Sequence, residues 1–215
     1  MRVYAVSLSV VIATFVLVPT TTSAQPTQPM RPAQPSQPAP QRPIPQQTID
    51  NLNTAIEGEA NASHRYTLFA RRADEEGHAQ VAKLFRAAAL AESIHRANHE
   101  RVLRNHGIEP KEPVLEDVKV GTTRENLEVP VKGEAEEREE TYPAFVRQAR
   151  RDDVPGAVRS FTFALNTEAE HAKLFQDALT NFGRNPPTDY FVGKVSGDTV
   201  TKVPDPQREP YVKVQ

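Results

Sequence analysis

Between residues 48 and 183, apolar side chains recur every three or four positions, the spacing that places them on one face of an α-helix. The pattern is interrupted three times, so it predicts four helices, each with one buried stripe. Gly77 and Gly107 end the first two runs, as glycine commonly does after a helix. The four predicted helices cover residues 48–77, 81–107, 122–151 and 153–182.

The starts and connections of these helices predict how they pack. Thr122 and Glu125 have the spacing of a capping box at the start of the third helix. The fourth helix opens at Asp153, with Pro155 in its first turn. Short links make helices one and two, and helices three and four, antiparallel neighbours, and residues 107–121 form a longer crossover. We therefore predict an all-α fold, a ferritin-like four-helix bundle of two helical hairpins.

The second hairpin repeats the first in sequence. At a spacing of 76 positions, the repeated pairs are Tyr66 and Tyr142, Phe69 and Phe145, Glu92 and Glu168, and His95 and His171. Gly58-Glu59 recurs only 75 positions later, as Gly133-Glu134, so the third helix carries one extra residue before Tyr142. A helix accommodates one added residue as a π-bulge, which would also relieve the conflict that Pro143 creates. Pro130 predicts either a kink in the third helix or a later start.

Several ionisable residues fall on the apolar stripes instead of on the solvent side. They are Glu59 on the first helix, Glu92 and His95 on the second, Glu134 and Glu137 on the third, and Glu168 and His171 on the fourth. A buried carboxylate costs several kcal/mol unless it is paired, protonated or bound to a metal. Carboxylates converging from four helices need a compensating positive charge, and two divalent cations supply it.

The spacing of these residues supports a metal centre. In Glu92-x-x-His95 and Glu168-x-x-His171 the two side chains leave one helix in the same direction. One glutamate from each of two helices, with Glu-x-x-His from the other two, is the pattern of dinuclear carboxylate sites in ferritin-like proteins. The sequence has no cysteine, so the ligands are carboxylate and imidazole, which suit iron, manganese or zinc. The alternative is a plain bundle with a buried polar network.

The remaining polar residues give weaker signals. We predict surface or boundary positions for His64, His78, His99 and His106, and a solvated face for Glu136, Glu139 and Glu140. Tyr66 and Tyr142 are either core aromatics or hydrogen-bond partners of the metal ligands. The net charge is −2 and no basic stripe is present, which argues against nucleic acid as a partner.

The first 47 residues differ in composition from the rest. Residues 1–24 combine Arg2, an apolar run from Val3 to Val18 and small residues ending at Ala24, the pattern of a secretory signal peptide. An uncleaved membrane anchor is the alternative, although the run is shorter than a bilayer span. Residues 25–47 are rich in proline and glutamine and predict an extended polyproline II linker. We expect the mature domain to lie outside the cytoplasm, in the periplasm or secreted.

Over residues 48–183 the chain resembles the rubrerythrin family. The motifs that carry the resemblance are Gly58-Glu59, Arg65-Tyr66-Thr67-x-Phe69-Ala70, Glu92-x-x-His95, Gly133-Glu134-x-x-Glu137, Tyr142-Pro143-x-Phe145 and Glu168-Ala169-Glu170-His171. The resemblance implies a non-haem di-iron site that reduces hydrogen peroxide to water, in a protein that commonly forms dimers.

The resemblance also implies a role for each site residue. Glu59 and Glu134 would be terminal ligands, and Glu92 and Glu168 would bridge the two irons. The other implied ligands are His171 for one iron and, for the second iron, Glu137 and His95, which would exchange when its redox state changes.

The tail, residues 184–215, departs from the family pattern. Residues 190–199 resemble a rubredoxin hairpin, with Gly193 and Ser196 at the places of two cysteines. The residues themselves also predict a hairpin, because two β-rich runs flank Ser196-Gly197-Asp198. Without cysteines the tail cannot bind iron as rubredoxin does, so we expect an electron donor outside this chain.

Three functions remain open from the sequence. The first is peroxide reduction at a di-iron site, with Glu92, His95, Glu137 and Glu168 as the catalytic ligands. The second is oxidation or sequestration of iron with O₂ as the oxidant. The third is a structural bundle held together by metal, without turnover.

Overall fold

The computed structural model describes residues 43–215. The predicted signal peptide and residues 25–42 of the predicted linker lie outside the described residues. The last two linker residues, Gln46 and Gln47, belong instead to the first helix, which begins two positions earlier than the sequence predicts. Among the described residues, no helix combines the length and apolarity that crossing a membrane requires.

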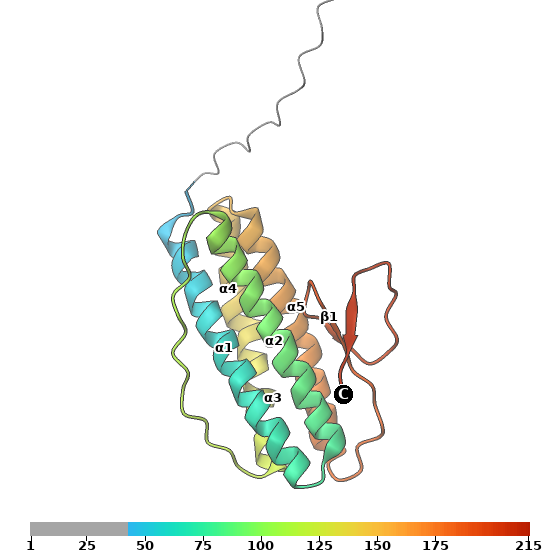
Figure 1. Cartoon of the computed structure of the whole chain (residues 1–215). Coiled ribbons are helices and arrows are strands. Elements are labelled where there is room, and N and C mark those ends of the chain that lie inside the picture. Colours follow the sequence, from blue (N-terminus) through green and yellow to red (C-terminus); the bar gives the residue numbers. More distant parts are fainter. Residues whose placement is uncertain (1–42) are drawn as a thin grey trace, which may run out of the picture. The chain divides into compact units, whose positions relative to one another are not determined.

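The described residues form the predicted ferritin-like four-helix bundle (Figure 1). Helix α1 (Gln46–Glu75) and helix α2 (Ala79–Asn105) make the first hairpin. In the second hairpin, one rod consists of α3 (Thr123–Glu136), the π-helical segment η1 (Glu137–Thr141) and α4 (Tyr142–Arg151), and the other is α5 (Pro155–Thr180).

Between the hairpins, residues 106–122 run along the outside of α1 without regular structure (Figure 1). Two asparagines of α1 supply partners for their backbone. Asn53 Oδ1 accepts from Lys111 N at 2.9 Å, and Asn61 Oδ1 accepts from Glu116 N at 2.8 Å. The crossover is thereby fastened along the bundle, which lets the second hairpin lie beside the first.

The helix ends follow the local signals in the sequence. Gly77 and Gly107 adopt φ values of +78° and +73°, the left-handed conformation that glycine allows after a helix. Thr122 and Glu125 form the predicted capping box. Helix α5 begins at Pro155, two residues after the predicted opening, because Asp153 has a positive φ of 54° and still belongs to the turn.

The extra residue of the third rod is absorbed as the sequence predicts. Segment η1 lies between Glu134 and Pro143, and its wider turn removes the clash that proline makes in a continuous α-helix. Of the two alternatives at Pro130, a later start is wrong, because α3 begins at Thr123 and runs through this proline.

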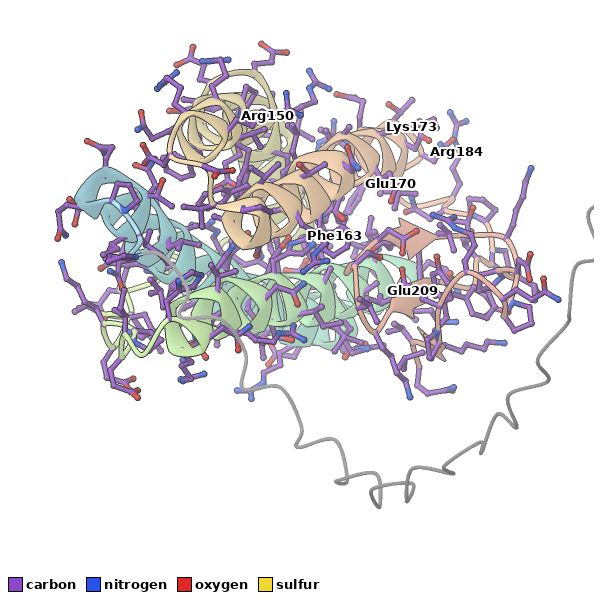
Figure 2. All side chains as sticks on the ribbon, turned by 90° about the horizontal axis from the view of Figure 1, so that it is seen from above. Arg150, Phe163, Glu170, Lys173, Arg184 and Glu209 are labelled. Atoms are coloured by element: carbon purple, nitrogen blue, oxygen red, sulfur yellow. The ribbon has the colours of Figure 1, made fainter. Side chains whose placement is uncertain are left out.

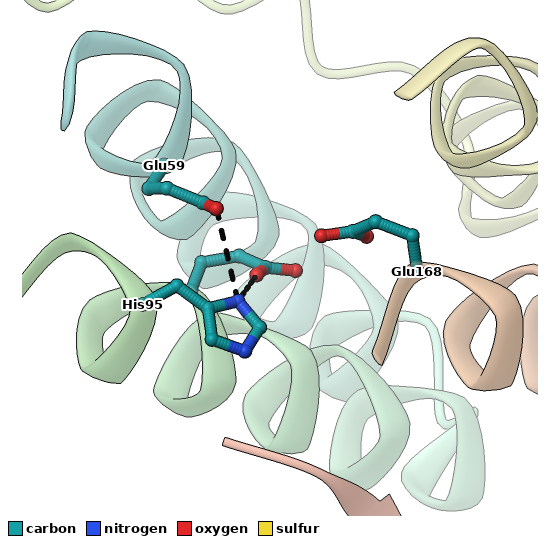
Figure 3. A group of neighbouring side chains, drawn as sticks. Glu59, His95 and Glu168 are labelled. Carbon is teal, nitrogen blue, oxygen red and sulfur yellow. Dashed lines mark hydrogen bonds and ion pairs between the residues drawn. The ribbon is translucent and has the colours of Figure 1, made fainter. Parts of the chain in front are cut away.

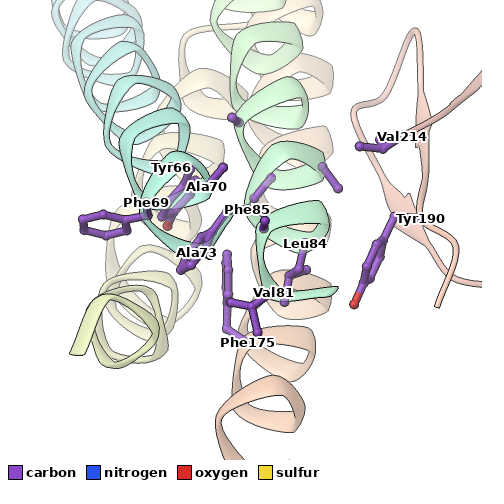
Figure 4. Packing of buried hydrophobic residues seen from close by; sticks show 14 of the residues in the cluster. Tyr66, Phe69, Ala70, Ala73, Val81, Leu84, Phe85, Phe175, Tyr190 and Val214 are labelled. Carbon is purple, nitrogen blue, oxygen red and sulfur yellow. The ribbon is translucent and has the colours of Figure 1, made fainter. Parts of the chain in front are cut away.

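The core is divided into two apolar clusters along the bundle. One contains Tyr66, Phe69, Phe85 and Phe175, most of which Figure 4 shows meeting between α1, α2 and α5. The other contains Leu52, Ile56, Leu103, Tyr142, Val146 and Phe161. Burying one such large side chain contributes about 1.5–3 kcal/mol. Between the two clusters lies the layer of the bundle that holds the acidic residues.

The tail forms a small antiparallel sheet in the order β2-β1-β3, from β1 (Phe191–Gly193), β2 (Thr199–Val200) and β3 (Tyr211–Lys213). The predicted hairpin is β1 and β2, joined by a turn in which Gly197 has a φ of +82°. Strand β3 was not expected from the sequence. The sheet lies alongside α2 and α5 (Figures 1 and 2).

Deleting Arg138 tests the role of the π-helical segment. The deletion removes the one residue that the wider turn absorbs, so the backbone between α3 and α4 must close as regular α-helical turns. It also forces Pro143 into a regular helix, at a cost of about 3 kcal/mol or more. We expect the free energy of unfolding in urea to fall by at least that amount. The control Arg138→Ala keeps the length of the rod and should change the free energy of unfolding by about 0.5 kcal/mol or less. Equal stability of both variants would contradict this role.

Candidate metal centre

Four glutamates, one from each rod of the bundle, meet in the layer between the apolar clusters. Glu59, Glu92, Glu134 and Glu168 are each at most 3% exposed, and His95 and His171 are fully buried. The repeat places these residues at matching heights on paired helices, so the fold brings together side chains that are up to 112 positions apart (59 to 171).

These residues form two overlapping groups, each with ligand atoms within 4.8 Å of one another. The first group is Glu59, Glu92, His95 and Glu168, and the second is Glu92, Glu134, Glu168 and His171. In Figure 3, Glu168 on α5 faces Glu59 and His95 across the bundle. Because Glu92 and Glu168 belong to both groups, the arrangement suits two metal ions that share two carboxylates.

Both histidines direct Nδ1 towards the carboxylates. His95 Nδ1 lies 2.9 Å from Glu92 Oε2, and His171 Nδ1 lies 3.0 Å from Glu92 Oε1. Metal-binding histidines commonly use one ring nitrogen for the metal and donate a hydrogen bond from the other. Here the other nitrogen, Nε2, faces the tail in both rings.

The tail holds the outer nitrogen of each histidine. His95 Nε2 lies 3.1 Å from the carbonyl oxygen of Ser196, which can only accept, so this nitrogen donates and Nδ1 is the atom left facing the centre. His171 Nε2 lies 3.0 Å from Thr199 Oγ1. The backbone nitrogen of Thr199 in turn donates to the Glu170 carboxylate at 3.2 Å. This bond fastens strand β2 of the tail to helix α5, on which Figure 2 labels Glu170. The sheet therefore fixes the orientation of both rings.

Gly197 lets the tail approach this closely. A Cβ atom at this position would collide with the His95 ring and lie 3.3 Å from the carbonyl oxygen of Ala91. Its φ of +82° independently favours glycine. The sequence marked Gly197 as a turn residue, but its contact with a candidate ligand is visible only in the fold.

Several polar atoms at the centre have no hydrogen-bond partner within residues 43–215. They are both carboxylate oxygens of Glu168 and His99 Nε2, whereas Glu92 Oε1 and His171 Nδ1 face each other as an ion pair at 3.0 Å. A buried polar atom without a partner costs roughly 1–3 kcal/mol, and more when charged. Divalent cations would satisfy these atoms together, because oxygen and imidazole nitrogen are the donors that iron accepts. The residues present thus fit a dinuclear metal site.

Two tyrosines connect the rods that carry the outer glutamates. Tyr66 on α1 donates a hydrogen bond to Glu134 on α3, and Tyr142 on α4 donates one to Glu59 on α1. The two bonds are related by the repeat. Of the two alternatives for these tyrosines, the hydrogen-bonding role is found. Burial raises the pKa of both hydroxyls well above the ordinary value, so they remain donors at neutral pH.

The protonation of the metal-free centre follows from its burial. Burial and the charge of Glu92 raise the pKa of Glu59 well above its ordinary value, and burial and the charge of Glu134 do the same for Glu168. Burial opposes the charged form of His171, but the adjacent Glu92 carboxylate raises its pKa to about 8. For Glu92, burial is likewise outweighed by His171, and its pKa lies below its usual range.

Glu137 lies beside the two groups but belongs to neither of them. It is the first residue of η1 and is partly buried. Burial, followed by the charges of Glu134 and Glu92, raises its pKa to about 8. The π-helical turn thus places a fifth carboxyl close to the centre, and its role as an exchanging ligand stays a prediction.

His99 was predicted to lie at the surface or boundary, and this is wrong. The ring is fully buried on α2, with Nδ1 2.7 Å from Ser160 Oγ and Nε2 3.7 Å from Glu59 Oε1. A signal was available in the sequence, because His99 continues the stripe of Glu92 and His95 four positions further on. The other three histidines, His64, His78 and His106, are partly exposed, and Glu136, Glu139 and Glu140 are exposed as predicted.

Comparison with known proteins agrees with this geometry. Residues 50–179 match the rubrerythrin family model. Rubrerythrin-2 of Clostridium acetobutylicum is 35% identical over 150 residues, covering 69% of this chain and 79% of that protein. A fully reduced, all-ferrous nigerythrin structure superimposes with a TM-score of 0.68 at 31% identity, covering 71% of this chain and 76% of that one. Bacterioferritin from Rhodobacter capsulatus, with a TM-score of 0.60 at 20% identity over 65% of this chain and 88% of that one, shares the fold.

The stability of the metal-free protein should fall as the pH rises from about 6.5 to about 8. Glu137 and His171 keep a proton in the folded state that they lose on unfolding, because folding raises their pKa values. The pKa values of Glu59 and Glu168 are raised as well, so these two residues change the stability in the same direction. Their stabilisation is complete below the unfolded-state pKa and is lost as the pH passes the folded-state value. Urea unfolding of the metal-free protein at several pH values measures this. Glu137→Gln should flatten the slope. Metal-loaded protein should lose the trend, since ligands bind deprotonated.

Thr199→Val tests the support that the tail gives to His171. The substitution keeps the shape of the side chain but removes the hydroxyl that faces His171 Nε2. Removing such a partner typically costs about 10–100-fold in metal affinity. Titration of metal-free protein with Fe²⁺ under anaerobic conditions measures the change. The control Thr201→Val alters an exposed threonine of the tail and should leave the affinity unchanged. Equal affinities for both variants would contradict a supporting role.

Proposed function

Because this chain belongs to the rubrerythrin family, whose members bind a di-iron centre, we propose that it reduces hydrogen peroxide to water with electrons from an external donor. The observation that carries the proposal is the pair of ligand groups sharing Glu92 and Glu168, with unpartnered atoms directed between them. The overall change is H₂O₂ + 2 H⁺ + 2 e⁻ → 2 H₂O. When bound, two ferrous ions supply the two electrons that break the O–O bond.

The protein residues hold the charge of the centre in both oxidation states. We assign Glu59 and Glu134 as terminal ligands, Glu92 and Glu168 as bridges, and His171 as the imidazole ligand of one metal position. The hydrogen bonds from the two tyrosines keep the terminal carboxylates in place. The surrounding apolar clusters exclude water from the layer.

Glu137 and His95 supply the movable part of the proposed centre. Glu137 is held by the π-helical turn, where the backbone bonds differ from those of a regular helix. Its carboxyl group carries a proton up to a pH of about 8 in the metal-free protein. We propose that His95 and Glu137 exchange as ligands of one metal position when its redox state changes.

We propose that a separate molecule supplies the electrons. The sequence has no cysteine, so this chain cannot hold the cysteine-bound iron of a rubredoxin domain. We propose that the protein works as a homodimer outside the cytoplasm, in the periplasm or secreted, with a donor present there. The support for this location is the leader-like composition of residues 1–24.

A second candidate function is oxidation or storage of iron with O₂. The observation that favours it is the fold shared with bacterioferritin, since the same ligand set suits both reactions. The two functions differ in the oxidant that the reduced centre prefers and in the fate of the iron.

Stopped-flow mixing of ferrous-loaded protein with hydrogen peroxide or with O₂ separates these functions. We expect oxidation by peroxide to be faster by about tenfold or more, which corresponds to about 1.4 kcal/mol in the barrier. Glu92→Ala and Glu168→Ala should slow it about a hundredfold or more, because each removes a carboxylate shared by both groups.

The matched control is Glu139→Ala, which alters an exposed carboxylate of η1. It should leave the rate unchanged. A preference for O₂ with iron released or accumulated favours the second function. Redox-silent zinc in protein from its native source favours a structural role and would end the peroxidase proposal.

A further inference from the structure

The repeat between the two hairpins is broken at one pair of buried positions beside the centre. His99 on α2 corresponds to Phe175 on α5, 76 positions later, and Ser160 on α5 corresponds to Leu84 on α2, 76 positions earlier. His99 and Ser160 touch each other, with Nδ1 and Oγ 2.7 Å apart. Phe175 and Leu84 are fully buried in one apolar cluster. A polar pair on one side thus stands where the other side has an apolar pair.

His99 and Phe175 each pack against a tyrosine and a phenylalanine that occupy equivalent places in the repeat. The His99 ring lies 6.1 Å from Tyr142 and 5.2 Å from Phe161 between ring centroids. Around Phe175, the equivalent distances are 5.4 Å to Tyr66 and 5.4 Å to Phe85. A phenyl ring therefore fits this kind of space. Burying imidazole and hydroxyl groups instead costs free energy, and packing gives no reason for the exchange.

One nitrogen of His99 is directed into the centre and has no hydrogen-bond partner within residues 43–215. This atom, Nε2, lies 3.7 Å from Glu59 Oε1. His95 Nδ1 also lies 3.7 Å from the same oxygen. Two donors that bind one metal at about 2.1 Å each stand about 3–4 Å apart, so each of these nitrogens is near enough to Glu59 Oε1 to bind the same cation as that oxygen.

The position of His99 on its helix is also that of a ligand. Glu92, His95 and His99 are three and four residues apart on α2, so all three side chains leave the same face. Glu92 and His95 belong to the group that includes Glu59. His99 is not one of the four residues whose ligand atoms lie within 4.8 Å of one another, but its Nε2 faces Glu59 of that group at 3.7 Å.

We propose that His99 is a further metal ligand, binding through Nε2 at the position formed by Glu59, Glu92, His95 and Glu168, and that Ser160 is the residue that orients it. In this arrangement Nδ1–H donates to Ser160 Oγ, which leaves the lone pair on Nε2 for the metal.

The proposal makes the two metal positions chemically unequal. The position at Glu59 would be faced by two imidazoles, from His95 and His99, and the position at Glu134 by one, from His171. At the second position, the place that corresponds to His99 is filled by Phe175, which offers no donor atom. This inference rests on the presence of the metal centre and not on the reduction of peroxide, so each can fail without the other.

The first experiment counts imidazole ligands in the full protein loaded with Co²⁺. X-ray absorption at the cobalt edge, with two Co²⁺ bound per chain, should show three imidazoles for every two metal ions. The double variant His99→Phe/Ser160→Leu copies the pair that the other hairpin already packs and so should fold. We expect it to show two imidazoles, and its weaker Co²⁺ position to lose affinity by at least about tenfold in a visible-absorption titration.

Two further variants separate ligation from packing. Phe175→Leu disturbs the equivalent place of the other hairpin without removing a nitrogen, so it should keep three imidazoles. Ser160→Ala should shift the cobalt absorption bands and lower the affinity by about tenfold, and Ser160→Thr, which keeps the hydroxyl, should restore both.

The outcomes decide the proposal in either direction. Two imidazoles for every two Co²⁺ in the wild-type protein would overturn it, and this count stands even if a variant does not fold. An unchanged cobalt spectrum in the double variant would also overturn it. Three imidazoles in a protein that does not consume peroxide would leave the His99 assignment standing and remove the proposed function.

Discussion

The structure depends on the burial of four carboxylates in one layer of a helical bundle. Uncompensated, such a layer would oppose folding, because charged groups lose their hydration there. The cost is partly met by proton uptake, which the raised pKa values of Glu59 and Glu168 express, and by hydrogen bonds from two tyrosines. The carboxylate oxygens of Glu168, which form no hydrogen bond in the described part of the chain, mark where cations would complete the layer. Metal binding and the stability of the bundle are therefore coupled, because the cations offset the cost of burying the carboxylates.

The tail shows how a segment without its metal-binding residues can still serve the centre. It has no cysteine, yet its backbone and one hydroxyl hold the outer nitrogens of His95 and His171. The positions where the family resemblance places two cysteines, Gly193 and Ser196, now belong to a hydrogen-bonded turn in which Ser196 Oγ donates to Asp198. The sheet therefore orients the rings of His95 and His171.

The internal repeat explains both the symmetry of the centre and its exception. Tyr66 and Tyr142 occupy equivalent places and make equivalent hydrogen bonds, and Glu92 and Glu168 each belong to both ligand groups. The pair of His99 and Ser160 has apolar counterparts, so the symmetry is broken on one side only. A bundle of two similar hairpins can tune two metal positions separately in this way, because each position has its own set of neighbours.

The sequence alone determined the helices, the π-helical turn and the four converging glutamates. Helix periodicity and capping are local, and the repeat carries long-range information because equivalent positions must face the same axis. Only the tertiary structure decided the burial of His99, the contact of the tail with both histidines and the third strand. Histidine occurs both at surfaces and in cores, so residue type alone does not place His99. Its hydrogen-bond partner, Ser160, is 61 positions away in the sequence. Such contacts depend on which segments fold against each other, and no local pattern along the chain encodes that choice.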